Sequence, residues 1–410
     1  MQRLLARLAG MQQFAALHHR GFRLLWTATL LSSTARWADV VVLGWLTLDL
    51  TASPLMVGIV TASRMAGYVA APFMGVIADR VDRRLLLIIA SLVNLATATI
   101  TLLLFVTGYL QLWHLVVLAV VSSLTWSLDH PTRQAFVPDL VGKDRLANAI
   151  ALNSVAVETT VVVGPGLGGL LIPAFGMAGA YGLIAGMYVL DVAVLLRLKD
   201  ARQTTTAAHE SPVKSLIGGL RYVRSNQTVL VLLLIAGLFN LFAAPYRYAF
   251  LPVFARYILD TGPAGYGMLT AMAGVGGLTS GFLVIALGNF RHKGALLVFA
   301  TFALPTSLLL FAVSTSYPLS LALVFVAGLT QAMTWTLIAT LILGHTAQSM
   351  RGRVMGLRTG VIITLPVGNL VAGAIAERFG PPIAQGAYAA AAAMLMLLIL
   401  IRVPGLRRLE

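Results

Sequence analysis

Ionisable side chains interrupt the long apolar stretches of this sequence at a few positions. Arg36 and Asp39 lie near the middle of the first stretch, Arg64 near the middle of the second and Glu158 near the middle of the fifth. Such groups are costly in hydrocarbon and by default mark a functional site. Arg36 and Asp39 are three residues apart, so a helix places them on one face. We expect Arg36, Asp39, Arg64 and Glu158 to form a buried cluster near a central cavity.

The chemistry open to this cluster is proton transfer. One carboxylate would release its proton to one side of a membrane and take one up from the other side. The alternative is a permanently paired set that only neutralises its own charge. Asp129 and Asp191 lie closer to the ends of their stretches. There we expect them to pair with nearby arginines.

The composition identifies the elements that must position these residues. Of the 410 residues, 59% are hydrophobic and 10% are charged, and the mean hydropathy is +0.88. Soluble globular proteins carry about 25% charged residues, and disordered chains are far less hydrophobic. The chain has no cysteine, which excludes a disulfide-stapled secreted fold. A multi-pass membrane protein remains.

A helix of about 20 apolar residues crosses the hydrocarbon layer. We predict twelve such spans, at 22–48, 55–78, 85–107, 112–134, 148–172, 180–198, 227–249, 264–287, 294–313, 319–343, 357–376 and 384–402. The fold class is therefore all-α, with twelve transmembrane helices as two pseudo-symmetric six-helix bundles.

One long polar stretch divides the spans into two sets of six. The predicted parts are an N-terminal segment (1–21), a six-helix bundle (22–198), a linker with an amphipathic helix (199–226), a second six-helix bundle (227–402) and a tail (403–410). The dipeptide Thr125-Trp126 in the fourth span recurs as Thr334-Trp335 in the tenth. Parallel repeats of this kind place a substrate site at the interface between halves.

Basic residues predict the orientation. Of the 29 basic residues, three (Arg247, Arg256 and Arg378) fall on one side of the predicted membrane and two arginines lie inside spans. The remaining 24 fall on the opposite side. The positive-inside rule places that rich side, with both termini, in the cytoplasm. The absence of cysteine fits a multi-pass protein of a bacterial inner membrane. The net charge of +15 is thus a topology signal, and nucleic-acid binding needs no hypothesis.

The strongest local motif lies between the second and third spans. It reads Gly75-Val-Ile-Ala-Asp79-Arg80-Val-Asp-Arg83-Arg84. Asp79 can sit at a helix N-terminus, where the macrodipole favours an anion. The motif resembles the signature called motif A of the major facilitator superfamily. The resemblance implies that this turn is a latch that holds one conformation closed on the cytoplasmic side. In that family an acid such as Asp129 braces the turn.

A second motif, Gly164-Pro165-Gly166-Leu167-Gly168-Gly169, lies in the fifth span. Its G-x-G-x-x-G spacing is no dinucleotide site, because that fingerprint needs a soluble strand–turn–helix unit. It resembles motif C of the superfamily's drug/proton antiporters. The proline bends the helix, and Gly164, Gly168 and Gly169 permit close helix approach.

Further segments, such as 131–141 and 351–356, are similar to the group that includes macrolide and enterobactin exporters. The resemblance implies that Arg133, four residues after Asp129, couples protons; a positive-inside anchor is the alternative. Polar or aromatic residues that could line a substrate cavity, or only bridge helices, are Trp126, Asn153, Asn240, Gln331, Trp335 and Asn369. The histidines show no metal-ligand spacing, so we expect neither a metal nor a cofactor.

These residues favour a proton-coupled, multidrug-type antiporter that exports small amphipathic molecules, drug-like or siderophore-like, and works as a monomer in the bilayer. A facilitator or symporter that imports its solute on the same fold remains open. An intramembrane enzyme is a remote alternative, because clustered nucleophile–base pairs or metal ligands are lacking. No phosphate-binding loop for ATP occurs in the sequence.

Overall fold

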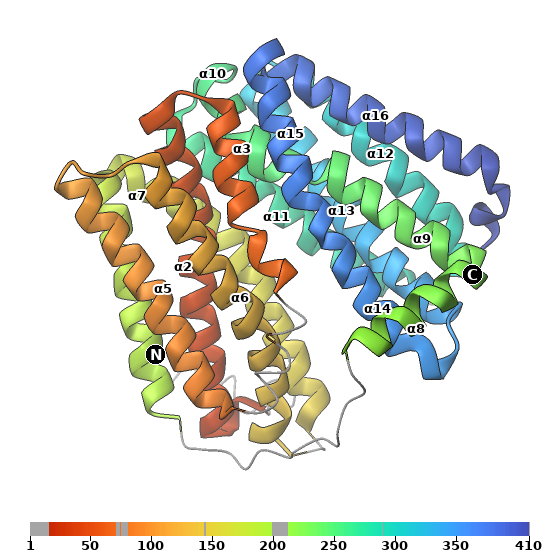
Figure 1. The fold of residues 1–410 in the computed structure, drawn as a ribbon, viewed down its shortest axis with the longest axis horizontal. Helices are drawn as coiled ribbons and strands as arrows, with labels where there is room; N and C mark the ends of the chain where they lie inside the picture. Colours follow the sequence, from red (N-terminus) through yellow and green to blue (C-terminus); the bar gives the residue numbers. More distant parts are fainter. Residues whose placement is uncertain are drawn as a thin grey trace. The chain divides into compact units, whose positions relative to one another are not determined.

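The computed structural model describes residues 16–70, 74, 81–142, 145–198, 212–288 and 290–409, without the side chains of Val69 and of residues 212–216. Throughout these ranges the regular structure is helical, and they contain no strand (Figure 1). Nine stretches of described helix are long and apolar enough to cross a membrane. The all-α membrane fold predicted from composition is confirmed.

The helices form two compact units, one made of Met1–Val42 with Ala66–Ala207 and the other of Leu43–Met65 with Ala208–Glu410. The first contains most of α2 (Arg20–Thr51), with α5 (Arg83–Val106), α6 (Leu112–Leu140) and α7 (Leu146–Leu196). The second contains α3 (Pro54–Ser63), α8 (Pro212–Ser225), α9 (Gln227–Leu238), α10 (Leu251–Tyr257), α11 (Gly262–Leu287), α12 (Lys293–Val313), α13 (Tyr317–Gly344), α14 (Arg351–Gly360), α15 (Thr364–Phe379) and α16 (Pro381–Arg402).

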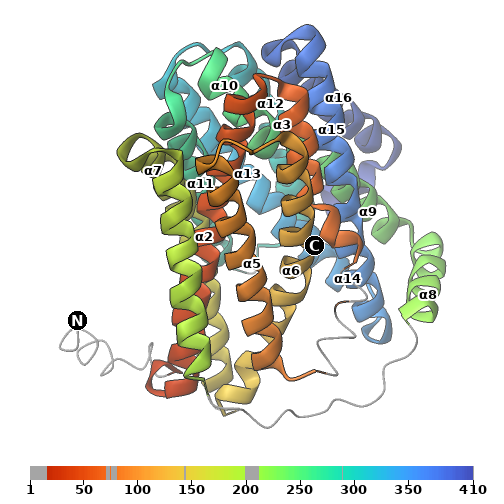
Figure 2. The same cartoon turned by 60° about the vertical axis from the view of Figure 1, so that its left-hand side comes forward.

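Within the first unit, α5 lies against both α6 and α7 (Figure 2). Helix α7 runs for 51 residues but contains one non-helical residue, Gly176, with φ of 69°. Glycine adopts positive φ without steric cost, so the chain can turn there. The two parts on either side of Gly176 correspond to the predicted spans 148–172 and 180–198.

Short polar side chains begin several helices. Ser53 caps α3 by accepting a hydrogen bond from the Met56 amide, and Pro54 occupies the first helical turn. Asp82 caps α5, with its carboxylate 2.8 Å from the Leu85 amide. Such caps satisfy backbone donors that have no partner inside the helix.

The seventh predicted span, 227–249, is longer and less regular in the structure. Helix α9 leads into two π-helical segments, η4 (Phe239–Ala243) and η5 (Tyr246–Phe250), before α10 ends at Tyr257. Pro245 lies between them and has no amide hydrogen to donate, so the regular helical bonding is interrupted. π-Helical turns often mark functional positions.

The second unit joins parts of the chain that are far apart in sequence. A Cβ on Gly58 of α3 would meet the Asn369 carbonyl oxygen of α15 at 2.6 Å, so these two helices touch through backbone. The Glu377 carboxylate accepts hydrogen bonds from the Ser53 hydroxyl at 2.8 Å and the Leu55 amide at 3.3 Å. Arg256 forms an ion pair with Asp49. The C-terminal part of α2 and all of α3 thereby pack with the rest of this unit.

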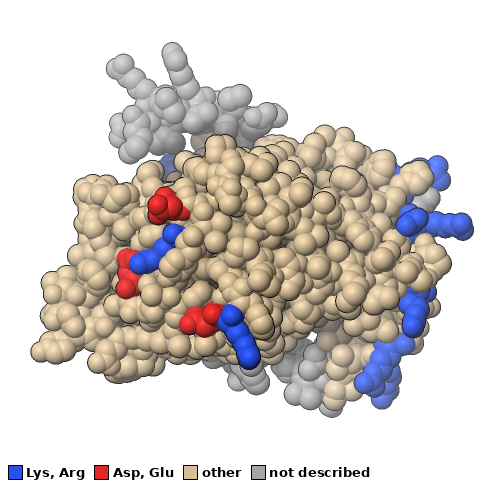
Figure 3. Space-filling model, turned by 90° about the horizontal axis from the view of Figure 1, so that it is seen from above, with Lys and Arg blue, Asp and Glu red and all other residues tan. Residues whose placement is uncertain are grey.

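Charged side chains are sparse on the face shown in Figure 3. Large apolar side chains are instead exposed along the helices, among them Phe282, Ile285 and Val313. An exposed apolar surface of this extent is expected where lipid replaces water.

Candidate functional site

An ion-pair network lies inside the first unit, centred on Arg133 of α6. The Nε atom of Arg133 donates to both carboxylate oxygens of Asp129, at 3.0 and 2.9 Å. Its second terminal nitrogen lies 3.5 Å from Oδ2 of Asp191 on α7. The remaining terminal nitrogen is 3.5 Å from the Thr29 hydroxyl of α2. One guanidinium thus links three helices and two carboxylates.

The network borders a polar hollow of about 270 Å³, which includes space open to solvent. The hollow is lined by Ser32, Ser33, Arg36, Ser91, Asn94, Trp126, Asp129 and Tyr188. Short hydrogen bonds fix two of the lining side chains. The Ser91 hydroxyl donates to Asp191 at 2.6 Å, and the Asn94 side-chain oxygen accepts from the Thr125 hydroxyl at 2.8 Å. Hydroxyls, an amide and charges of both signs therefore face one space.

Three neighbouring side chains contact Trp126, which lines this hollow. Its indole nitrogen donates to the Tyr68 hydroxyl at 3.2 Å, and the His130 ring lies 5.0 Å away. The guanidinium carbon of Arg36 stands 3.9 Å from the indole centroid, a cation–π contact. The predicted cavity residue Trp126 and the predicted charged residue Arg36 thus meet directly.

The expected cluster of Arg36, Asp39, Arg64 and Glu158 is not a single buried group within one unit. Arg64 is buried but belongs to the second unit, whereas the other three belong to the first. Asp39 is half-buried, and Glu158 is exposed, so its predicted burial is wrong. The reason is helical geometry: Ala156 and Thr160, two residues on either side, are buried, and two residues correspond to about 200° around the helix.

The basic turn before α5 is described in part: Gly75, Asp79 and Arg80 lie outside the described residues. Arg83 forms an ion pair with Asp139 and donates to the Ala135 carbonyl oxygen at 2.8 Å, both on α6. Asp129, the expected brace, lies ten residues earlier on α6, about 15 Å along the helix from Asp139, and is bonded by Arg133. The part of the turn that it is expected to brace lies outside the described residues.

Arg84 reaches the other neighbour of α5. Its side chain donates to the carbonyl oxygen of Leu196 at 2.8 Å, and its Nε atom lies 3.4 Å from that of Leu195. These are among the last carbonyl groups of α7, which have no partner within the helix. The two arginines thus fix the start of α5 to the ends of α6 and α7.

The glycine-rich motif of α7 is a helix crossing. A Cβ on Gly164 would stand 2.4 Å from the Trp37 side chain, and one on Gly168 would stand 2.5 Å from the Ala38 carbonyl oxygen, both on α2. Pro165 and Gly169 of the same motif are buried. The first turns of α7 before this crossing hold Asn153, which is half-buried with its side-chain oxygen unbonded among the described residues.

In the second unit, Trp335 of α13 lies beside Arg358 of α14. The guanidinium carbon is 4.8 Å from the indole centroid, and a terminal nitrogen donates to the Trp335 carbonyl oxygen at 3.0 Å. The Phe239 ring meets the same indole edge-on, with centroids 5.8 Å apart. Each unit therefore holds a tryptophan stacked with an arginine, and the sequence repeat relates the two tryptophans but not the two arginines.

The predicted amides of this unit bridge segments. Gln331 accepts from the Tyr246 hydroxyl at 3.2 Å, and the buried Asn240 donates to the Val361 carbonyl oxygen at 3.5 Å. Asn369 is buried, with its nitrogen 3.4 Å from the Met65 sulfur. Its side-chain oxygen has no hydrogen-bond partner in the described part of the chain. Bridging is thus the role that the geometry gives Gln331 and Asn240.

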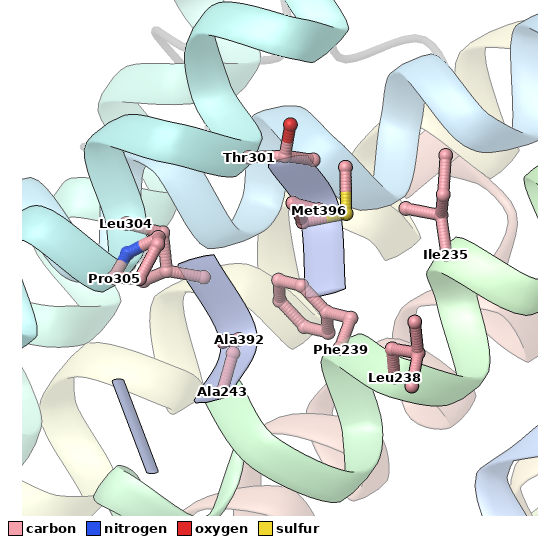
Figure 4. Close-up of a pocket in the computed structure, with 9 residues that line it drawn as sticks. All are labelled: Ile235, Leu238, Phe239, Ala243, Thr301, Leu304, Pro305, Ala392 and Met396. Carbon is pink, nitrogen blue, oxygen red and sulfur yellow. The ribbon is translucent and has the colours of Figure 1, made fainter. Parts of the chain in front are cut away.

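An apolar hollow of about 300 Å³, open space included, lies beside Trp335's neighbour Phe239 (Figure 4). Its walls come from α9, η4, α12 and α16, and Thr301 supplies the polar side chain among aliphatic ones such as Leu304 and Met396. This hollow suits an apolar group, in contrast to the polar hollow of the first unit.

Sequence reasoning missed three partners in the first unit. Ser91 and Thr29 resemble the many other hydroxyl residues of apolar helices, most of which bond to their own backbone, as Thr29 also does with the Leu25 carbonyl oxygen at 2.8 Å. Asp139 lies in the segment 131–141, but nothing in that segment marks it as the partner of Arg83. No group of three His, Asp or Glu side chains suited to a metal occurs within the described ranges.

Over residues 11–410 the sequence matches the family described as transmembrane secretion effector. The chain belongs to this branch of the major facilitator superfamily. The predicted superfamily and its fold are thereby confirmed.

Two curated relatives match about two thirds of this chain. The enterobactin exporter EntS of Shigella boydii serotype 18 is 27% identical over 277 residues, which are 67% of this chain and 65% of the exporter, slightly less than two thirds of its length. EntS of Escherichia coli O1:K1 gives the same identity and coverage.

Among solved structures, the nucleoside transporter NupG superposes with a TM-score of 0.76 and 11% identity, covering 93% of this chain and 98% of NupG. A POT family transporter in complex with 5-aminolevulinic acid gives a TM-score of 0.76 at 11% identity, covering 94% of this chain and 96% of the other. At these identities the likeness shows the fold alone.

Proposed function

We propose that this transporter exports a small amphipathic molecule, drug-like or siderophore-like, in exchange for protons. The observation that carries the proposal is the network of Arg133, Asp129 and Asp191 beside a polar hollow. Proton-coupled transporters use carboxylates that lie within the membrane beside a polar hollow. The similarity to proteins named enterobactin exporters supports outward transport of a siderophore-like molecule.

The hollows support an amphipathic substrate class. The polar hollow offers hydroxyls and an arginine stacked on Trp126, whereas the hollow at Phe239 is almost entirely apolar. The polar hollow by itself combines hydroxyls and charges with the aromatic ring of Trp126, which suits a molecule with both polar and apolar parts. We retain Asp39 and Glu158 as further candidates for the coupling carboxylate.

Transport by the purified protein in liposomes tests this proposal. An imposed pH gradient should drive accumulation of a dye-like cation or a siderophore, and collapse of the gradient by an ionophore should abolish it. Asp39→Asn and Glu158→Gln run beside the parent. Transport that is equal with and without the gradient would instead indicate a facilitator on the same fold.

We also propose that both termini and the connections rich in arginine lie in the cytoplasm, with the chain acting as a monomer in the inner membrane and the six-helix halves divided at 199–226. The absence of cysteine makes the orientation directly measurable. Ser225→Cys in α8 and Thr315→Cys between α12 and α13 are both exposed. In intact cells, a membrane-impermeant maleimide should label the Thr315 variant and spare the Ser225 variant; the reverse pattern contradicts the orientation.

A further inference from the structure

Asp191, in the second part of α7, is a fully buried carboxyl, with 0% of its surface exposed. Its Oδ2 atom accepts from the Ser91 hydroxyl at 2.6 Å and lies 3.5 Å from a terminal nitrogen of Arg133. Its Oδ1 atom is buried and has no hydrogen-bond partner among the described residues. The two oxygens of this carboxyl therefore stand in different environments.

Charged groups of both signs surround Asp191. The titratable groups that act on it are Arg133 and Asp129, both from α6. Tyr188, from its own helix, acts on the same guanidinium, while His130 and Arg36 lie around Asp129. The packed neighbour α5 contributes the hydroxyl of Ser91, and α2 that of Thr29. Arg133 thus contacts both carboxylates, and Arg36 adds a second positive charge to the hollow that Asp129 lines.

A buried carboxylate is costly unless its oxygens are paired and hydrogen-bonded, and a proton removes its charge. Asp129 is the poorer carrier, because both of its oxygens accept from Nε of Arg133 at about 3 Å. Asp191 is the better one: its contact with Arg133 is longer, and its Oδ1 atom is the oxygen without a donor. An unbonded carboxylate oxygen is unfavourable in a buried site, whereas the same oxygen of a protonated carboxyl group carries no formal charge.

A route for this proton is present. Ser91 bonds to Asp191 and also lines the polar hollow, which includes space open to solvent. Its hydroxyl can pass a proton between water in the hollow and the carboxyl, since a hydroxyl both donates and accepts. Arg133, which already contacts both carboxylates, compensates whichever of them is ionised.

We propose that Asp191 is the proton-binding carboxyl of this transporter. This inference rests on the proposed proton coupling. On deprotonation the Oδ2–H bond breaks as the proton passes to the Ser91 oxygen, the Ser91 hydroxyl releases its own proton to water in the hollow, and Arg133 compensates the charge of the carboxylate. Protonation from the other side of the membrane reverses the step and returns Arg133 to Asp129.

The test is transport in liposomes by the full-length protein, with Asp191→Asn beside Asp82→Asn. Both variants replace a carboxylate by an amide, but Asp82 is an exposed helix cap, where asparagine caps equally well. A gradient of one pH unit can sustain about a tenfold accumulation for each proton exchanged. Asp191→Asn should lower that ratio to about one while substrate exchange at equal pH stays within about twofold of the parent; Asp82→Asn should match the parent in both.

Continued gradient-driven accumulation by Asp191→Asn overturns the inference and leaves the proposed function standing. Failure of the parent itself to respond to the gradient overturns the proposed function. Should Asp191→Asn not fold, Asp191→Glu replaces it, because it keeps the carboxyl and moves it by one methylene. The pH at which gradient-driven substrate accumulation is half-maximal should then shift, while substrate exchange at equal pH persists. An unchanged pH profile of accumulation would contradict the inference.

Discussion

Replacing Gly168 by alanine tests whether the glycine-rich motif of α7 is a helix crossing. The added Cβ would stand 2.5 Å from the Ala38 carbonyl oxygen and 2.9 Å from its Cα atom. Ordinary contacts begin at about 3.4 Å, so α2 and α7 must separate by roughly 1 Å or lose their local geometry. Overpacking of this kind costs about 1–3 kcal/mol.

Gly186, on the same helix α7, provides the matched control. A Cβ there meets nothing within 4 Å. Alanine stabilises a helix over glycine by about 1 kcal/mol, and this gain applies to both variants, so it cancels in the comparison. We therefore expect Gly168→Ala to be less stable than Gly186→Ala by about 1–3 kcal/mol.

The assay is thermal unfolding of the purified variants in one detergent, followed by tryptophan fluorescence. A difference of this size lowers the apparent melting temperature by several degrees. Gly168→Ala should melt below Gly186→Ala, and Gly186→Ala should melt at or above the parent. If Gly168→Ala melted with Gly186→Ala, the backbone contact between α7 and α2 would not exist as described, and the motif would need another explanation.

Two further perturbations follow from single contacts. Ser53→Ala removes the cap of α3 and the hydroxyl that donates to Glu377; it should destabilise the protein by about 1 kcal/mol, whereas Ser53→Asn, which can still cap, should recover most of the melting temperature. Equal melting of the two variants would contradict the cap. Trp126→Leu removes the aromatic face beneath Arg36, worth about 0.5–2 kcal/mol, and Trp126→Phe should retain part of it; a Leu variant as stable as the Phe variant would show that the ring contact contributes nothing.

The fold was predictable because its signals are local and repeated. A span needs only about 20 apolar residues, and its ends are marked by residues such as Pro54 and Gly176, whose backbone preferences act within one turn. The same locality limited the prediction for the seventh span. Its irregular course around Pro245 depends on π-helical turns, which leave no periodic signal in the sequence.

The site was predictable in residue type but not in pairing. Buried charges could be found by their cost in hydrocarbon, and Arg133 and Asp129 lie one turn apart on the same helix. Which carboxyl meets that arginine from another helix depends on rotation about each helix axis. A rotation of about 100° per residue decides whether a side chain is buried, as with Asp191, or exposed, as with Glu158. The sequence does not specify that angle across a bend such as the one at Gly176.

The central claim is that substrate and proton movements are coupled, and coupling between two ligands is reciprocal. The most direct measurement is therefore proton movement driven by substrate alone. Liposomes with equal pH on both sides and a pH-sensitive dye inside receive a substrate gradient. Proton-coupled antiport predicts that substrate entering the liposomes drives protons out, so that the internal pH rises transiently, and that Asp191→Asn abolishes this rise. Substrate flux by the parent with no accompanying pH change would contradict proton-coupled export.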